Sequence, residues 1–521
     1  MRRFPFLCLP CLLCACGPGT VRLPSDTGQP GDLQWFWGDL HAHSGWSYDG
    51  CEEPDDACTH LPAGPGSDFY AEAAEAGLDF AALTDHAEAD YYRFAADDLH
   101  PTGGTYDVWQ GQELLASQAD GGPVVPILGY EWTAAKDEAH GVTPGSHRTV
   151  LLADTQACGA YRIPGSWLPE DGFVPEQGDR RFIQEQAPDR TTPPELWAGL
   201  YQAALSPGCT SVRWLTFAHH SAYVVPQATD WAVASNAPLS EQVVEMYSEH
   251  GSSECRDTSK DGCGWALNDA QGYLPSGSVQ AALDRGYALS FVGGTDSHDG
   301  RPGSLADGPS AVAHWAEDSE SPQRQFTGGG LTGLLAPAPL GRDGIFDALQ
   351  ARRTIATSGP RPQLVALATG QDGTAYLPGA TIPRWNLPAG IVLVLGDLDP
   401  RGGRSWDDYG DVLVERVTDG GRVVAWGAGT AFGDRWDPPS DESWTYLRVR
   451  IAVKGPVMAT DPKQGEERVW ISPWFAGPAD GCSTAGGRSG AALALLGLGL
   501  AWGRQRGRRP GPRGRLSARS A

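Results

Sequence analysis

The chain has 521 residues, of which 40% are hydrophobic and 20% are charged, and its formal net charge is −25. This length allows one large domain and a smaller one. Ten arginines lie in the two termini, so the body of the protein is more acidic than the whole chain. An acidic body repels nucleic acid phosphates, which argues against a DNA or RNA partner.

The N-terminus predicts export. Met1-Arg2-Arg3 and the following apolar run are typical of a signal peptide, here over residues 1–16. Leu13-Cys14-Ala15-Cys16 resembles a bacterial lipobox with Cys16 as the lipid-bearing residue; the alternative is a secretory signal cleaved elsewhere. Residues 17–33 have the composition of a linker. We expect a membrane-anchored protein in the envelope or at the surface of a Gram-negative bacterium.

Residues 34–362 alternate short apolar runs with helical segments, a pattern that predicts βα units and parallel strands. We expect helices at 68–76, 279–285 and 345–351, and strands at 78–83, 124–130, 214–218, 242–247 and 289–293. A histidine or carboxylate follows each of these strands within a few residues. In α/β barrels the active site lies at this end of the strands.

The residues after position 362 have a different pattern of apolar and polar positions. Residues 363–475 alternate apolar and polar positions, which predicts a small antiparallel β domain. Residues 476–521 comprise a Gly/Ser-rich spacer, an apolar run and an Arg-rich tail, a pattern that resembles a C-terminal sorting signal. The apolar run is shorter than the roughly 20 residues of a spanning helix. The alternative is a disordered basic tail.

Six cysteines lie in the body of the protein. Their proximity in the sequence favours the pairs Cys51–Cys58, Cys158–Cys209 and Cys255–Cys263, one of fifteen possible pairings. Disulfides suit an oxidising, exported location. Zinc binding by cysteine is the competing interpretation, but the body has no C-x₂-C spacing.

The histidines indicate a metal site. In His41-Ala42-His43 the two-residue period of a strand places both imidazoles on one face, although exposed strand histidines are also common. Mixtures of imidazole and carboxylate suit zinc, manganese or iron. The candidate ligands are His41, His43, Asp49, His86, Glu131, His219, His250, Asp296 and His298.

These motifs resemble those of the polymerase and histidinol phosphatase (PHP) superfamily, and more narrowly its branch called domain of unknown function 3604. The resemblance covers about residues 34–362. It is carried by the order H-x-H, D-H, E, H, H and D-x-H and by the segments Gly38-Asp39-Leu40-His41-Ala42-His43-Ser44, Gly129-Tyr130-Glu131-Trp132, Ser146-His147-Arg148, Val244-Glu245-Met246-Tyr247 and Ala351-Arg352-Arg353-Thr354.

The resemblance implies a distorted (β/α)₇ TIM-like barrel that holds two or three divalent ions. It implies a first ion on His41, His43, Glu131 and Asp296, a second on Glu131, His219 and His250, and a third on Asp49, His86 and His298. Either His219 or His220 fits the pattern.

The implied activity is that of a metal-dependent hydrolase, most naturally a phosphoesterase that uses metal-bound hydroxide on a small anionic substrate. The candidate catalytic residues are Asp85, His147 and Arg148. Asp85 is expected either to orient an imidazole or to accept a proton, and Arg148 to hold a substrate oxyanion. The alternative function is a metal-containing surface binding protein without turnover.

Overall fold

The computed structural model describes residues 21–22, 32–44, 69–87, 108–134, 147–163, 192–209, 211–223, 229, 231, 241–259, 263, 273–297, 300–303, 329–397, 409–454 and 465–478. The expected signal peptide and the Cys51–Cys58 pair lie outside these residues. So do Asp49, His298, most of the linker and nearly all of the C-terminal segment.

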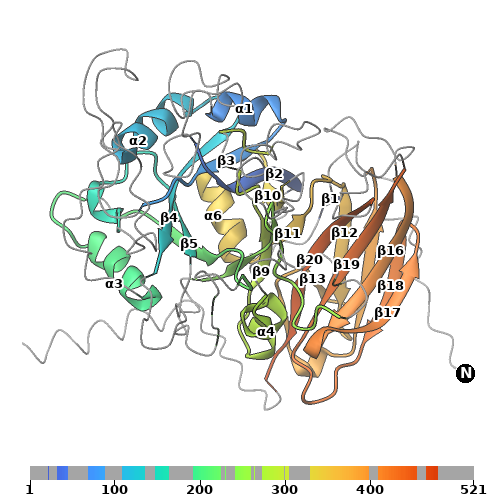
Figure 1. Ribbon diagram of the computed structural model, residues 1–521. Coiled ribbons are helices and arrows are strands. Elements are labelled where there is room, and N and C mark those ends of the chain that lie inside the picture. The colour runs from blue at the N-terminus through green and yellow to red at the C-terminus, as the bar shows by residue number, and fades with distance from the viewer. Residues whose placement is uncertain are drawn as a thin grey trace, which may run out of the picture.

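The first part of the chain mixes helices and strands (Figure 1). In chain order its elements are β1 Val21–Arg22, β2 Asp32–Ala42, α1 Phe69–Glu75, β3 Phe80–Leu83, α2 Val108–Ala119, β4 Val125–Thr133, β5 His147–Leu152, α3 Pro193–Ala203, β6 Trp214–Ala218, β7 Val243–Ser248, β8 Gly251–Ser252, α4 Val279–Asp284, β9 Ser290–Gly293, β10 Leu331–Pro337, α6 Arg342–Gln350 and β11 Thr354–Thr357.

The second part consists of strands joined by turns and single-turn 3-10 helices. Its strands are β12 Leu364–Thr369, β13 Ala375–Tyr376, β14 Thr381–Ile382, β15 Ala389–Leu395, β16 Tyr409–Thr418, β17 Arg422–Ala428, β18 Ala431–Trp436, β19 Trp444–Val453 and β20 Glu466–Ala476.

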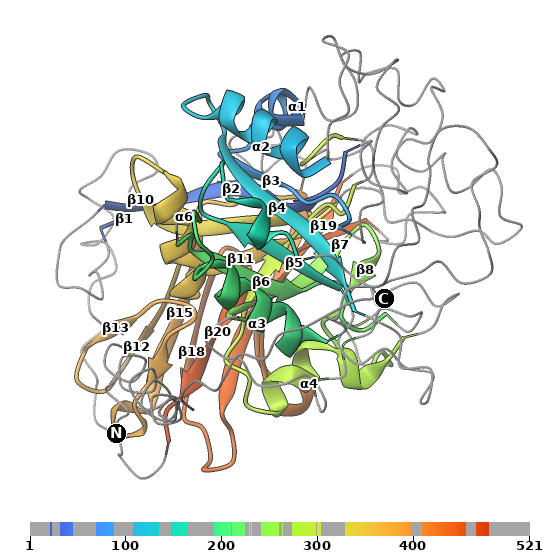
Figure 2. The same ribbon diagram turned by 90° about the vertical axis from the view of Figure 1, so that its left-hand side faces the viewer.

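One mixed sheet of 16 strands runs through both parts. Its main path is β17-β16-β19-β20-β11-β10-β2-β3-β4-β5-β6-β7-β8, with β9 paired to β7. A second sheet, β13-β12-β15-β18, faces β16, β19 and β20 across a core that includes Ile391, Leu393, Val449 and Ile471. Figures 1 and 2 show the two layers of strands in the second part and the helices around the first.

The expected (β/α)₇ barrel is wrong. The protein is mostly β, with five α-helices in the described ranges, and its main sheet is mixed. Strands β2, β3 and β4 are parallel, as are β6, β7 and β9, but β5 is antiparallel to both β4 and β6. On the other side of β2, β10 and β11 are antiparallel and continue into β20. The sheet therefore extends into the second part, so the sheet itself has no break near residue 362.

Individual elements lie close to where their patterns place them. The fully buried strands β3, β7 and β9, and β6, which is buried from Leu215 onward, end next to the residues expected to carry chemistry. Helix α3 begins with a capping box between Thr192 and Glu195, and α4 begins at Ser278, whose hydroxyl accepts a hydrogen bond from the Ala281 amide. Helix α6 packs Ile345, Phe346 and Leu349 against the sheet. These contacts hold the strands whose ends carry the site.

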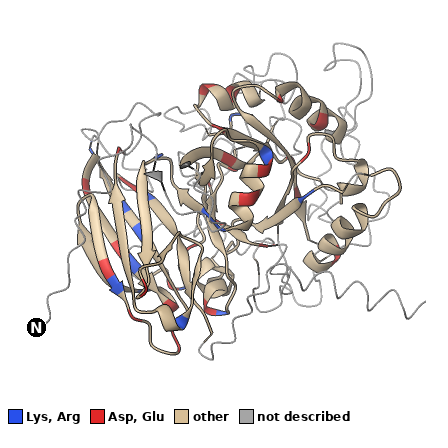
Figure 3. Ribbon diagram, turned by 180° about the vertical axis from the view of Figure 1, so that it is seen from behind, with Lys and Arg blue, Asp and Glu red and all other residues tan. Residues whose placement is uncertain are grey.

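The acidic composition is visible on the surface. Figure 3 shows Asp and Glu along the helices, and Asp343 and Asp347 of α6 have side chains that are 87% and 61% exposed. In the second part, arginines lie beside acids on neighbouring strands, as in the pair Arg450–Glu466 at 2.9 Å. Across the described residues, no helix has the length and apolar character needed to cross a membrane.

Two of the three expected disulfides are confirmed. Cys158–Cys209 and Cys255–Cys263 are bonded, with Cα–Cα distances of 5.6 Å and 5.8 Å. The first joins the loop after β5 to the segment after α3. The second closes a short loop after β8.

A buried ionic network fastens the β7–β8 region to the second part. The Glu254 carboxylate accepts hydrogen bonds from Tyr446 Oη at 2.6 Å, Trp470 Nε1 at 2.8 Å and Arg448 Nη1 at 2.9 Å. Arg448 also donates through Nε to Glu415 at 2.7 Å. All of these side chains are buried, so each charge depends on its partner.

We expect Arg448→Met to lower the free energy of unfolding by about 3–5 kcal/mol, because it leaves Glu254 and Glu415 buried without their cation. Arg435→Met is the control, since Arg435 and Asp437 form an exposed pair at 3.7 Å, and the expected change is below about 1 kcal/mol. Urea unfolding followed by tryptophan fluorescence measures both. Equal stability of the two variants would contradict the role given to the network.

Candidate metal centre

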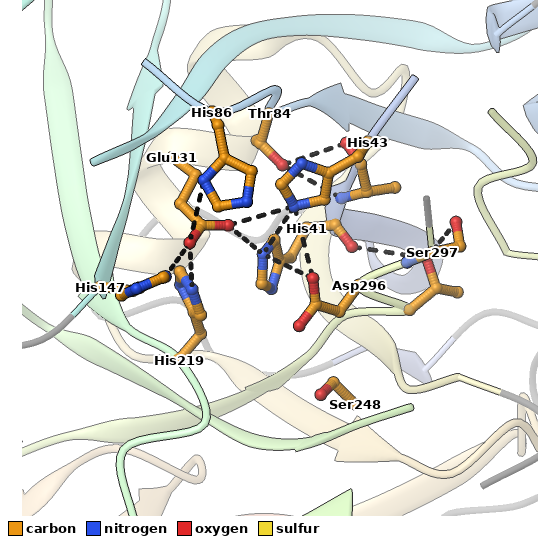
Figure 4. Close-up of polar contacts among 12 residues, drawn as sticks. His41, His43, Thr84, His86, Glu131, His147, His219, Ser248, Asp296 and Ser297 are labelled. Atoms are coloured by element: carbon orange, nitrogen blue, oxygen red, sulfur yellow. Dashed lines mark hydrogen bonds and ion pairs between the residues drawn. The ribbon is translucent and has the colours of Figure 1, made fainter. Parts of the chain in front are cut away.

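The site forms where several strand ends meet. The end of β2 and the residue after it are hydrogen-bonded to the segment after β9. Asp296 N donates to His41 O and His43 N donates to Ser297 O, each at 2.7 Å. His86 after β3 forms a parallel bridge with Glu131 of β4. His147 begins β5, His219 and His220 follow β6, and His250 lies in the turn between β7 and β8. Figure 4 shows Glu131 and Asp296 among the imidazoles.

Four ligand atoms converge at the centre of the site. They are His41 Nε2, His43 Nε2, Glu131 Oε2 and Asp296 Oδ1, and we call this group the central site. Each imidazole nitrogen lies 3.1–3.2 Å from Glu131 Oε2 and 3.2–3.4 Å from Asp296 Oδ1. The two nitrogens are 3.4 Å apart.

These separations fit a shared cation better than a set of hydrogen bonds. Two imidazole nitrogens supply at most two protons, whereas five short contacts join the four atoms. A tetrahedral ion with bonds of about 2.0–2.2 Å separates its ligand atoms by about 3.3–3.6 Å. The central site therefore has the donor types and the spacing of a four-ligand metal position.

Glu131 extends the centre in one direction through its other oxygen. Oε1 lies 3.2 Å from His219 Nε2 and 3.6 Å from His86 Nδ1, and it contacts His147 Nδ1. Glu131, His147, His219 and His220 can hold a second ion, and we call this group the Glu131 site. One carboxylate thus faces two metal positions, one with each oxygen.

Asp296 extends the centre in the other direction. Its Oδ1 faces the central site, while its Oδ2 lies 3.1 Å from His250 Nε2. His220, His250 and Asp296 form a third group, which we call the Asp296 site. His220 belongs to both outer sites, so the three positions form one connected cluster.

Strained backbone brings consecutive residues to the same site. In an extended strand His219 and His220 would point to opposite faces. His220 has a φ of +29°, and the two rings lie 4.3 Å apart between centroids. Asp296 also has a positive φ, +56°. Such conformations cost about 1–3 kcal/mol each in residues other than glycine and cluster at functional sites.

Buried polar groups orient the ligands from behind. His41 Nδ1 is bonded to Glu245 Oε2 at 2.8 Å, which directs Nε2 to the central site. His219 Nδ1 is likewise bonded to Thr149 Oγ1 at 3.0 Å. Asp39 accepts from the amides of His41 and Thr295, at 3.0 Å and 3.1 Å, and so ties the two strand ends together. Such partners fix the tautomer and direction of metal-binding imidazoles.

Burial and neighbouring charges shift the pKa values of the residues in the cluster. Burial opposes ionisation of Glu131 and Asp296, yet the neighbouring imidazoles hold the pKa of both carboxyls well below its usual range. Burial lowers the pKa of His41, but the charges of Asp296 and Glu245 outweigh it and raise that pKa well above its usual value. Burial lowers the pKa of His219 to about 3, which keeps its ring neutral as metal binding requires.

The structure brings together most of the expected ligands. His41, His43, His86, Glu131, His219, His250 and Asp296 all lie in the cluster, whereas Asp49 and His298 lie outside the described residues. His250 groups with Asp296 and His220 rather than with Glu131 and His219. Both His219 and His220 belong to the groups of possible ligands.

The three expected catalytic residues have other surroundings. His147 contacts Glu131 and is grouped with the ligands. Arg148 is fully buried and forms an ion pair with Glu241 at 2.5 Å, so we withdraw its role as an oxyanion holder. Asp85 accepts hydrogen bonds from the Ser44 amide at 2.7 Å and Gln112 Nε2 at 3.0 Å, and thereby holds the segment after His43.

The sequence reasoning missed Glu245 and Asp39 as supporting residues. Both lie within segments that carry the PHP resemblance, and a buried carboxylate at a strand position is unusual enough to signal a partner.

Comparison of the chain with protein-family models, with curated proteins and with solved structures found no match.

We expect Gly294→Ala to weaken metal binding by about 10-fold or more, because changes to residues that position a metal ligand reduce metal affinity by this amount. A Cβ at Gly294 would lie 2.5 Å from His41 Cβ, so the end of β2 must move. The control is Gly390→Ala, where a Cβ has no atom within 4 Å. Competition with a colorimetric chelator measures affinity; unchanged affinity in Gly294→Ala would show that this contact does not position His41.

Proposed function

We propose that this protein is a metal-dependent hydrolase, most naturally a phosphoesterase, with two or three divalent ions of zinc, manganese or iron. The observation that carries the proposal is the convergence of two imidazoles and two carboxylates at 3.1–3.4 Å in the central site. Ionised carboxylates are costly to bury without compensation, and a divalent cation supplies it.

In the proposed reaction, some residues hold the ions and others orient the metal-binding imidazoles. When bound, adjacent divalent ions polarise a phosphoryl or carbonyl oxygen and lower the pKa of water to near neutrality. Glu131 and Asp296 each place one oxygen in the central site and the other in an outer site. Each carboxylate therefore fixes the position of an outer site relative to the central site. Glu245 and Thr149 hold the imidazoles of His41 and His219 in place.

Bound divalent ions would supply positive charge for an anionic substrate. The groups of possible ligands contain two carboxylates, Glu131 and Asp296, among six imidazoles. Arg148, which follows His147, is paired with Glu241. The resemblance of the motifs to the PHP superfamily supports the same activity, because phosphate esters are the commonest substrates of that family. This part of the proposal rests on the motifs and not on a barrel fold.

The two disulfides support an exported location, since such bonds persist in oxidising compartments. We propose that the protein works in the cell envelope or at the cell surface, anchored through its N-terminal lipid, its C-terminal apolar tail or both. A small phosphate ester in that compartment is the proposed substrate, and the acidic surface makes nucleic acid an unfavourable one.

We expect the full-length protein to hydrolyse a generic phosphomonoester or phosphodiester, and His43→Ala to reduce kcat/KM by at least about 100-fold, because it removes a ligand of the central site. Release of p-nitrophenol measures turnover, and elemental mass spectrometry of the same samples measures metal. The control is Tyr201→Ala, at a position that is 54% exposed on α3.

Full turnover in His43→Ala would overturn the assignment of the central site to catalysis. Metal bound by the wild type without turnover of either ester would instead favour the alternative, a metal-containing surface binding protein.

A further inference from the structure

The Asp296 site differs from the other two positions in its exposure. The His250 side chain is 30% exposed, whereas the side chains of His41, Glu131 and Asp296 are at most 2% exposed. His220 is 4% exposed as a residue. Of the described ligands, His250 is thus the one that water reaches readily. An ion beside it has the shortest route to solvent.

The number of protein ligands also differs. The central site has four, which is the complement of a closed tetrahedral position. The Asp296 site has three among the described residues, namely two imidazoles and one carboxylate. Three protein ligands leave room for water or substrate, as in catalytic zinc sites and in iron sites with the same ligand types.

A second observation, independent of exposure, concerns His220, which belongs to both outer sites. His220 Nδ1 is buried and has no hydrogen-bond partner among the described residues. Leaving such a group without a partner costs about 1–3 kcal/mol. The φ of +29° at His220 adds backbone strain of similar size. A cation bound by His220 would offset these costs.

We propose that the Asp296 site holds the most readily exchanged ion of the cluster and is the position where a substrate oxyanion binds. This inference rests on the proposed hydrolase function and deepens it. Asp296 connects this site with the central site, because its Oδ1 lies 3.2 Å from His41 Nε2 and its Oδ2 lies 3.1 Å from His250 Nε2. Tyr223 lies beside this site, with its ring centroid 5.8 Å from those of His220 and His250.

The test uses the full-length protein stripped of metal and titrated with Mn²⁺ alone. Bound ions are counted by elemental mass spectrometry after gel filtration in buffer that contains the same free Mn²⁺ concentration. The wild type is expected to bind Mn²⁺ in at least two affinity classes. His250→Ala is expected to bind one ion fewer per chain, with the weakest class missing and the tighter classes within about threefold of the wild type. His250→Glu supplies an oxygen ligand and is expected to restore the missing ion.

Water-proton relaxation gives a second readout. Mn²⁺ in an open site enhances relaxation, and inorganic phosphate is expected to reduce the enhancement in the wild type but to have no effect in His250→Ala. Retention of the weakest class in His250→Ala, or loss of every class with unchanged circular dichroism, would overturn the proposal.

The two proposals can fail separately. If wild-type protein turns over phosphate esters and His250→Ala does so equally with the same metal content, the Asp296 site is wrong while the hydrolase stands. If the metal and phosphate measurements come out as expected but no ester is hydrolysed, the site stands as an oxyanion-binding position and the hydrolase fails.

Discussion

Two buried carboxylates, Glu131 and Asp296, impose the main physical constraint on this protein. Both are almost completely buried, yet neighbouring imidazoles hold the pKa of each carboxyl well below its usual range. Each presents its two oxygens to two different groups of ligands. Charge of this kind is stable in a protein interior only when cations or several donors compensate it. The strand ends and their supporting residues hold these carboxylates among the imidazoles. The positive φ at His220 and Asp296 belongs to the same arrangement.

The architecture explains how a mixed sheet holds so many ligands together. Short parallel strands end on one side of the sheet, and the antiparallel strand β5 contributes its first residue, His147, to the same place. The second part of the chain lies outside the cluster but is fastened to it through Glu254, four residues after His250. The network of Glu254 with Arg448, Tyr446 and Trp470 thus anchors the segment that follows the β7–β8 turn.

Much of the site could be predicted from the sequence, because metal ligands follow simple local rules. The two-residue period in His41-Ala42-His43 fixes a shared face, and Glu131 and Asp296 follow buried apolar runs. The same period also explains an error: next to His147, Arg148 points to the opposite face and pairs with Glu241. His220 could not be assigned, because only the positive φ brings it to the side of His219.

The fold was harder to predict than the site. Fully buried strands give continuous apolar runs, which do not reveal whether neighbouring strands are parallel or antiparallel. The antiparallel pairs β4–β5, β5–β6 and β10–β11 therefore could not be distinguished from βα units, and the barrel was the wrong conclusion. Partners across long sequence distances, such as Glu245 for His41, leave no local signal of their pairing.

The most direct test of the central claim is the metal content of the full-length wild-type protein, purified without chelators or a metal affinity resin and measured by elemental mass spectrometry. The arrangement of Glu131 and Asp296 predicts two or three divalent transition-metal ions per chain. A protein that contains none, even after reconstitution with zinc, manganese or iron, would contradict the assignment of the cluster to metal binding.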